Sequence, residues 1–268
     1  MYTKLSIAAV LLLMLCSCGA RITPEDTLEQ AIAAHEQADH FQVHMNASQK
    51  TDMDAVSVKQ TASTNVQIAK DKNQYYMDSN IKNPVTSIDT RLYIDGEDYY
   101  MQSDKLEMEW MLLDDPDIKS QLGGSLMMDY DNPSVYLNLL LDDVNRMTVK
   151  TKDGATRLVV TEPTEKTKLA IAQYLIDNAK TMEQGTDFDI EVQSVDMNDL
   201  EIVFDERTSL IRSISMDQVV KLKFGIPTAE SKIKQTNMTI SQTLTVTYDH
   251  YDDTEIELPD ELTTFLAG

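Results

Sequence analysis

Residues 92–110 read LYIDGEDYYMQSDKLEMEW. Leu92 and Ile94 alternate with polar residues, and the pair Asp95-Gly96 follows them directly. Alternation with a period of two places the apolar side chains on one face of a β-strand. An Asp-Gly pair favours the two-residue turn of a β-hairpin, because that turn needs positive φ at its central residues. The stretch therefore predicts an antiparallel hairpin with one apolar face.

The same alternation continues across residues 41–113. Its apolar members are Phe41, Val43, Met45, Ala47, Val56, Val58, Val66, Ile68, Leu92, Ile94, Leu106, Met108, Trp110 and Leu112. Turn-forming pairs such as Lys72-Asn73 and Asn83-Pro84 separate the alternating runs. The linkers are too short for the crossovers that parallel strands need. We therefore expect an antiparallel meander over this part of the chain.

Helical segments precede and interrupt the strand pattern. Thr23 is a good N-cap and Pro24 suits the first helical position. Residues 114–143 are the most apolar part of the chain after its N-terminal run, and they predict a helical insertion. The expected helices are 24–39, 116–128, 133–143 and 164–182.

Strands return after the insertion. We expect them at 145–153, 156–162, 187–196, 199–206, 209–217, 219–225, 233–249 and 255–258. Strands and helices are segregated along the chain, which is typical of α+β proteins. The predicted fold is α+β, with a large curved antiparallel sheet and helices packed on its concave face.

The N-terminus predicts an exported, lipid-anchored protein. An apolar run, residues 5–15, is too short to be a comfortable permanent membrane span and is typical of a signal peptide. The sequence Leu15-Cys16-Ser17-Cys18 resembles a bacterial lipobox. In that motif Cys18 is the acylated residue, because Ser17 before it is small, whereas Cys16 follows a leucine. The alternative is an ordinary signal peptide with incidental cysteines.

The lipobox divides the chain and gives its location. We expect a lipoprotein signal peptide at 1–17, the lipidated N-terminus and a short tether at 18–22, and a single domain at 23–268 with the helical insertion at 114–143. The protein would then sit on the extracytoplasmic face of the cell membrane, held by acyl chains such as palmitate. The mature chain has no second cysteine, so it forms no internal disulfide.

The chain has 268 residues and a formal net charge of −22. Such a surface repels nucleic acid and anionic headgroups, so no nucleic-acid partner is expected. The charge also suits two further interpretations: simple solubility through self-repulsion, or recruitment of cations or a basic envelope protein partner. Charge alone does not separate them.

Three stretches carry a family resemblance: the hairpin quoted above, FDERTSLIRSISM at 204–216 and TYDHYDDTEIELPDEL at 247–262. Together with the acylated cysteine and the helix after it, they resemble the LolA-like and LppX-like lipoproteins, and specifically an uncharacterised family of Gram-positive surface lipoproteins. The resemblance implies an open half-barrel that carries apolar ligands and has no catalytic residues.

The expected binding site is a groove between the curved sheet and the helices. The chain has 15 methionines, and methionine adapts to irregular apolar cavities. Our candidates for lining residues are Trp110, Met127, Met128, Leu137 and Leu140, although apolar residues of this kind also fill ordinary cores. Gly123-Gly124 beside the two methionines suggests a movable lid.

The sequence contains no recognised catalytic or metal-binding motif. The four histidines are not spaced as a ligand pair on one helix face, and the acidic clusters at 129–132 and 249–253 do not match the EF-hand loop. No phosphate-binding loop or nucleophile elbow occurs. We therefore expect no enzyme activity, no metal and no cofactor. The leading hypothesis is a membrane-anchored protein that binds a lipid or other hydrophobic ligand; the alternative is an envelope protein-interaction scaffold with an acidic surface, and a hydrolase is the weakest.

Overall fold

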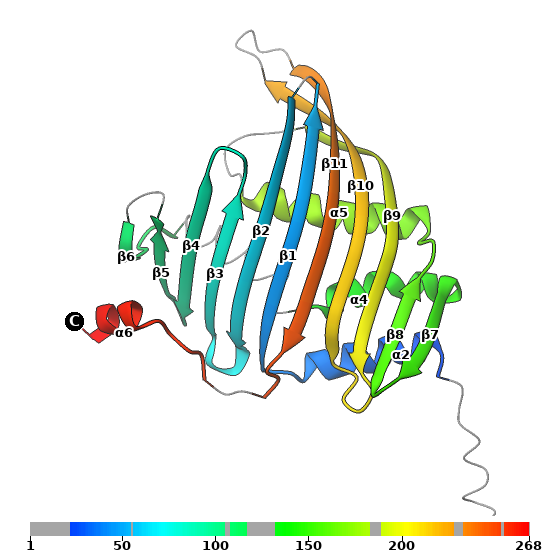
Figure 1. Ribbon diagram of the computed structural model, residues 1–268, viewed down its shortest axis with the longest axis horizontal. Helices are drawn as coiled ribbons and strands as arrows, with labels where there is room; N and C mark the ends of the chain where they lie inside the picture. Colours follow the sequence, from blue (N-terminus) through cyan, green and yellow to red (C-terminus); the bar gives the residue numbers. More distant parts are fainter. Residues whose placement is uncertain are drawn as a thin grey trace, which may run out of the picture.

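The computed structural model describes residues 22–54, 56–104, 108–116, 132–182, 189–227, 233–252 and 255–267. Cys18, Met127 and Met128 lie outside these residues, as does nearly all of the helix expected at 116–128. The described residues form one antiparallel sheet of eleven strands, in the order β6-β5-β4-β3-β2-β1-β11-β10-β9-β8-β7 (Figure 1). Its two edges, β6 and β7, do not meet, so the sheet is open.

The chain enters the sheet in the middle, moves to one edge, and returns from the other. The strands are β1 (His40–Met53), β2 (Val56–Ala69), β3 (Gln74–Lys82), β4 (Ser87–Asp95), β5 (Asp98–Ser103), β6 (Met108–Leu112), β7 (Met147–Lys152), β8 (Ala155–Val160), β9 (Asp189–Asp205), β10 (Ile211–Pro227) and β11 (Ile233–Asp249). The first strand, β1, pairs with the last, β11, so two consecutive meanders share one continuous sheet. The antiparallel meander predicted over 41–113 is confirmed.

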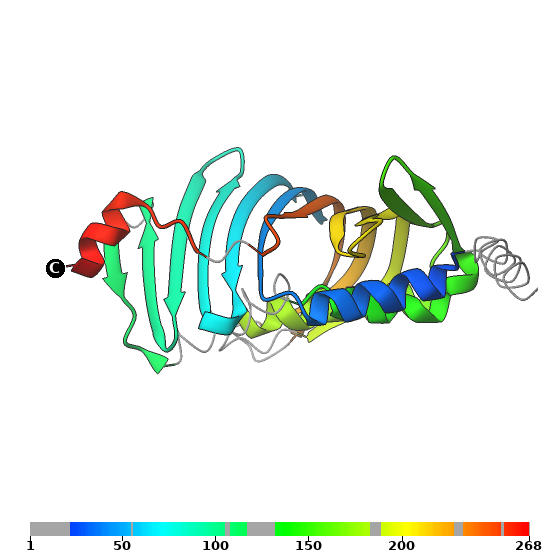
Figure 2. The same cartoon turned by 90° about the horizontal axis from the view of Figure 1, so that it is seen from below.

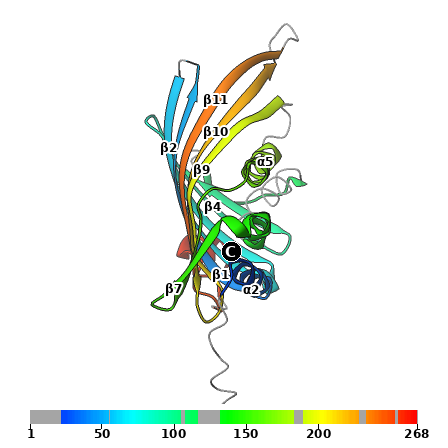
Figure 3. The same cartoon turned by 90° about the vertical axis from the view of Figure 1, so that its right-hand side faces the viewer.

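Three helices, α2 (Pro24–Glu36), α4 (Ser134–Leu140) and α5 (Glu165–Met182), cover one face of this sheet. There are also two short 3-10 helices in the described part of the chain, η1 (Lys70–Lys72) between β2 and β3 and η3 (Leu141–Arg146) directly after α4. Figures 2 and 3 show the strands curving around α2, α4 and α5, which lie on the concave side. The hydroxyl of Thr23 accepts a hydrogen bond from the backbone N–H of Asp26, which confirms the predicted cap. The predicted fold class is therefore confirmed.

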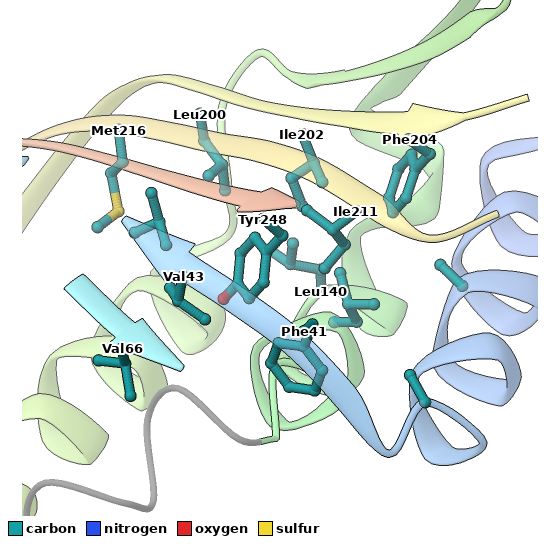
Figure 4. Close-up of a cluster of buried hydrophobic side chains, with 14 of the residues drawn as sticks. Phe41, Val43, Val66, Leu140, Leu200, Ile202, Phe204, Ile211, Met216 and Tyr248 are labelled. Carbon is teal, nitrogen blue, oxygen red and sulfur yellow. The ribbon is translucent and has the colours of Figure 1, made fainter. Parts of the chain in front are cut away.

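Alternation along the strands sorts the side chains between the two faces. On β1, Phe41 and Val43 are buried beneath the helices, whereas Gln42 and His44, which alternate with them, point to the convex face. The buried side chains of the concave face form the largest apolar cluster of the described residues. Figure 4 shows part of it, in which Val43, Met216 and Tyr248 come from three strands and Leu140 comes from α4. This cluster is the main apolar core of the described part of the chain.

Two of the predicted strand pairs are in fact single long strands. The sequence analysis separated 187–196 from 199–206 and 209–217 from 219–225, but β9 and β10 each run unbroken for 17 residues. Register shifts near Asp217 and Leu222 accommodate the interruptions in the apolar pattern without ending either strand. These register shifts arise from the pairing of β9 with β10, so the sequence of either strand alone does not predict them.

The C-terminal segment also differs from expectation. Residues 255–258 are not a strand; they lead into α6 (Asp260–Ala267), which was not predicted. The side-chain amide of Gln67 replaces strand pairing: its oxygen accepts from the Glu257 N–H at 2.7 Å and its nitrogen donates to the Glu257 carbonyl at 3.3 Å. Leu262 of α6 is fully buried against Tyr76, Tyr93 and Trp110 on the convex face. The segment thus covers an aromatic patch that the sheet would otherwise expose.

Candidate ligand cavity

An apolar cavity of about 130 Å³ lies between the concave face of the sheet and helices α4 and α5. Its lining residues are Met45, Tyr136, Leu140, Ile171, Leu200, Ile202, Ile214, Met216, Gln242, Leu244, Val246 and Tyr248. Nine of the twelve come from β1, β9, β10 and β11, and three come from the helices. The cavity therefore has a floor of paired strands and a roof of two helices.

The floor follows directly from strand register. Met45 of β1 is opposite Val246 of β11, and Val246 is opposite Ile214 of β10. Residues directly opposite each other in an antiparallel sheet present their side chains on the same face. Alternation then brings every second residue of β11, from Gln242 to Tyr248, to the same surface. An apolar strip along β11 becomes the centre of the cavity floor.

The two roof helices are joined by a buried carboxylate. Asp143, 1% exposed, lies in η3 directly after α4, and its Oδ2 accepts a hydrogen bond from the Thr164 N–H at 2.9 Å, just before α5 begins. The Thr164 hydroxyl in turn accepts from the Thr167 N–H in the first turn of α5. Lys166 and Asp142 form an ion pair between the same two segments. The first turn of η3 and the start of α5 are thus held together on one side of the roof.

A buried histidine holds α2 against the sheet beside the cavity. His35 is 1% exposed, and its Nε2 accepts a hydrogen bond from the Ile211 N–H of β10 at 3.0 Å. Its ring packs edge-on against Tyr248, which also lines the cavity, and against Tyr251. Burial, together with a smaller effect of the Lys70 ammonium, lowers the pKa of His35 from 6.5 to about 4. The neutral imidazole is therefore a structural acceptor at this position.

The cavity lining suits binding rather than proton transfer. It contains aliphatic side chains, two methionines, two tyrosines and the amide of Gln242. Among the residues that the structure describes, no three histidine, cysteine or acidic side chains are grouped so as to hold a metal ion. No described helix is long and apolar enough to cross a membrane. What this site can do chemically is exclude water from an apolar group.

The structure separates the residues predicted for the groove. Leu140 lines the cavity, and Leu137, one turn earlier on α4, is fully buried in the adjoining core. Trp110 lies elsewhere: it is buried under α6 on the convex face. Alternation explains this placement, because Tyr99 and Met101 of β5 face the concave core, whereas Tyr100, opposite Leu112 of β6, shares the convex face with Trp110. Met127 and Met128 lie outside the described residues.

The floor residues were the ones that sequence reasoning missed. Met45 was recognised as part of an apolar strand face, and Met216 and Leu244 carry the same alternation. That signal identifies a buried face but does not say which stretch of it lies beneath the helices. That stretch is determined by where α4 packs over β10 and β11, and α4 is far from both strands in the sequence.

This geometry defines a class: an open, curved antiparallel sheet with a helical layer that encloses a small apolar cavity. The chain belongs to the family of unknown function DUF6612, whose sequence profile matches residues 23–264. The predicted membership of an uncharacterised family is therefore confirmed. A search of curated proteins returns no match.

Several solved structures match most of the chain at low identity. LprF from Mycobacterium bovis is 11% identical, covering 89% of this chain and 96% of its own, with a TM-score of 0.33. A LolA superfamily protein from Nitrosomonas europaea is 11% identical, covering 90% and 97%, with a TM-score of 0.23. An outer membrane lipoprotein-sorting protein domain from Vibrio parahaemolyticus is 9% identical, covering 91% and 99%, with a TM-score of 0.27.

Proposed function

We propose that this protein is a non-enzymatic lipoprotein, anchored through Cys18 on the extracytoplasmic face of the cell membrane, that binds a lipid or other hydrophobic ligand between its sheet and helices α4 and α5. The observation that carries the proposal is the apolar cavity at that interface. A close-packed core leaves few voids of this size, because unfilled apolar space costs stability. Occupancy by a ligand would offset that cost.

The cavity volume limits the size of the ligand that this structure can hold without movement of the helices. About 130 Å³ is below the 300–1,000 Å³ of typical small-molecule sites and close to the size of a void that holds a benzene-sized molecule. A short or branched apolar group fits as the structure stands. A longer acyl chain requires the roof to separate from the floor. Among the residues that the structure describes, the roof supplies Tyr136, Leu140 and Ile171, so this movement would leave the paired strands of the floor intact.

The proposed anchor would keep the cavity near the bilayer. Helix α2 begins at Pro24, six positions after Cys18. A fully extended chain spans at most about 3.6 Å per residue, so the tether reaches roughly 20 Å. A protein held so close to the membrane would take its ligand from the membrane and present, store or sense it there. Long-range shuttling would need a longer tether or release.

Native mass spectrometry with organic extraction tests the proposal. The chain from Gly19 contains every element that the structure describes, and it would be expressed in a lipid-containing host. We expect a discrete, extractable, lipid-sized mass. Leu140→Trp fills the cavity from the roof and should abolish that mass, whereas Leu169→Trp, on the exposed side of α5, should keep it. A clean apo mass that persists after incubation with envelope lipids would refute ligand binding and leave the scaffold alternative.

A further inference from the structure

Four glutamines lie side by side across the middle of the sheet. The register places Gln60 of β2 opposite Gln49 of β1, Gln49 opposite Gln242 of β11, and Gln242 opposite Gln218 of β10. Directly opposite residues share a face, and Gln242 lines the cavity, so all four point to the concave side. We call these four residues the glutamine row.

The glutamine row divides two apolar surfaces of the concave face. On one side, Leu244 and Met216 line the cavity. On the other side, Val220 and Leu222 pack with Ala172 and Val195 in a second, separate cluster. A polar row between two apolar surfaces is costly unless its hydrogen-bonding groups are satisfied. Each buried amide group of the glutamine row therefore needs a hydrogen-bond partner.

One acceptor of the row is not satisfied. Gln218 is 4% exposed, and its Nε2 donates a hydrogen bond to Oε1 of Gln242 at 2.8 Å. Its own Oε1 is buried and has no hydrogen-bond partner within the described part of the chain. The residue that Gln218 contacts, Gln242, forms the polar end of the cavity lining. A buried carbonyl next to a cavity is a site for a donor supplied from outside the protein.

We propose that the ligand is a neutral amphiphile whose hydroxyl or amide N–H donates to Gln218 Oε1, while its apolar chain extends into the cavity towards Leu140. The inference rests on the proposed function and names the ligand class for that site. An ionised carboxylate is disfavoured, because the lining offers it no cation and burial of an unpaired charge is costly. An ester is disfavoured because it only accepts hydrogen bonds. Long-chain alcohols and acyl amides meet both conditions.

Photo-crosslinking of the full chain tests this class. Phosphatidylcholine vesicles would carry one of three diazirine probes with the same alkyl chain, ending in a primary alcohol, a primary amide or a methyl ester. Mass spectrometry measures labelling of the peptides that contain Met45, Met216 and Leu244. We expect the alcohol and the amide to label these peptides on the order of fivefold more than the ester, which corresponds to one net hydrogen bond.

Paired substitutions assign the preference to the row. Gln218→Met with Gln242→Met removes the buried amide pair, and replacing both partners by apolar groups of similar shape keeps the fold. Labelling by the three probes should then become equal. Gln49→Met with Gln60→Met, on the same row but away from the unpaired oxygen, is the matched control and should keep the preference. Trp110 emission reports whether each variant is folded.

The outcomes separate this inference from the function on which it rests. Equal labelling by all three probes in the parent chain, abolished by Leu140→Trp, would overturn the inference and leave ligand binding intact. A preference that survives the Gln218 and Gln242 pair substitution, or a preference for the ester, would also overturn it. Absence of cavity labelling by every probe, unchanged by Leu140→Trp, would refute the proposed function itself.

Discussion

Lowering the pH from 6.5 towards 4 should weaken the fold through His35. In the folded chain this imidazole is buried, accepts a hydrogen bond from the Ile211 N–H, and has a pKa of about 4, whereas its ordinary value is 6.5. Between these values the unfolded chain binds a proton that the folded chain does not. The contribution of neutral His35 is therefore complete above pH 6.5 and is lost as the pH falls towards 4.

The size of the effect follows from the two pKa values. Their difference of about 2.5 units, at about 1.4 kcal/mol per unit, corresponds to about 3 kcal/mol of unfolding free energy. That is a large share of the 5–15 kcal/mol typical of a domain. The physical cause is desolvation by Phe41, Tyr248 and Tyr251, whose rings surround the imidazole, with a smaller effect of the Lys70 ammonium.

Urea unfolding followed by Trp110 fluorescence, repeated across this pH range, measures the effect. The carboxylates also titrate there, so the quantity of interest is the difference between the parent chain and His35→Gln. Glutamine can accept from Ile211 but does not titrate. On acidification from pH 6.5 towards 4, we expect the parent chain to lose about 3 kcal/mol more unfolding free energy than His35→Gln. If the two chains lose stability in parallel, the buried neutral histidine is not what makes the fold acid-sensitive.

Two further predictions concern packing. Leu137→Ala empties a fully buried position of α4 and should lower the free energy of unfolding, measured in urea, by about 2–5 kcal/mol. Leu169→Ala, on the exposed side of α5, should lower it by much less, and equal losses would contradict the packing of α4 against the sheet. Gln67→Leu removes both hydrogen bonds to the Glu257 backbone and should loosen α6 at a cost of about 1–2 kcal/mol. Acrylamide should then quench Trp110 more strongly, because Leu262 covers it; unchanged quenching would show that α6 holds without Gln67.

Local sequence signals were reliable where one strand or helix decides its own structure. The N-cap at Thr23 and the strand 233–249 appear where they were predicted, and the hairpin indicated by Asp95-Gly96 forms with Gly96 and Glu97 as its two loop residues. Gly96 indeed adopts a positive φ of 61°. Helix α6 was missed although Pro259, Asp260 and Glu261 are ordinary helix-start residues, because the alternation of Ile256 and Leu258 favoured a strand.

Long-range signals were weaker, and the candidate site depends on them. Trp110 was predicted in the groove as part of an apolar alternation, yet the convex face of β6 has an apolar partner too, Leu262, from far along the chain. A period-two pattern says that a face is buried but not what covers it. Leu137 and Leu140 were chosen from the most apolar insertion, and the structure places both on the buried side of α4.

The sequence by itself determined that this protein is an α+β chain built on a long antiparallel meander, because alternation and turn chemistry act over a few residues. It also predicts a lipid anchor, because residues 15–18 resemble a lipobox that ends at Cys18. The tertiary structure alone decided that β1 pairs with β11, that α4 and α5 close a cavity over that pair, and that four glutamines line up across it. The pairing of β1 with β11 joins residues about 200 positions apart, and the cavity joins residues of α4 to those of β10 and β11, about 70 to 110 positions away, so only the assembled sheet and helices bring them together.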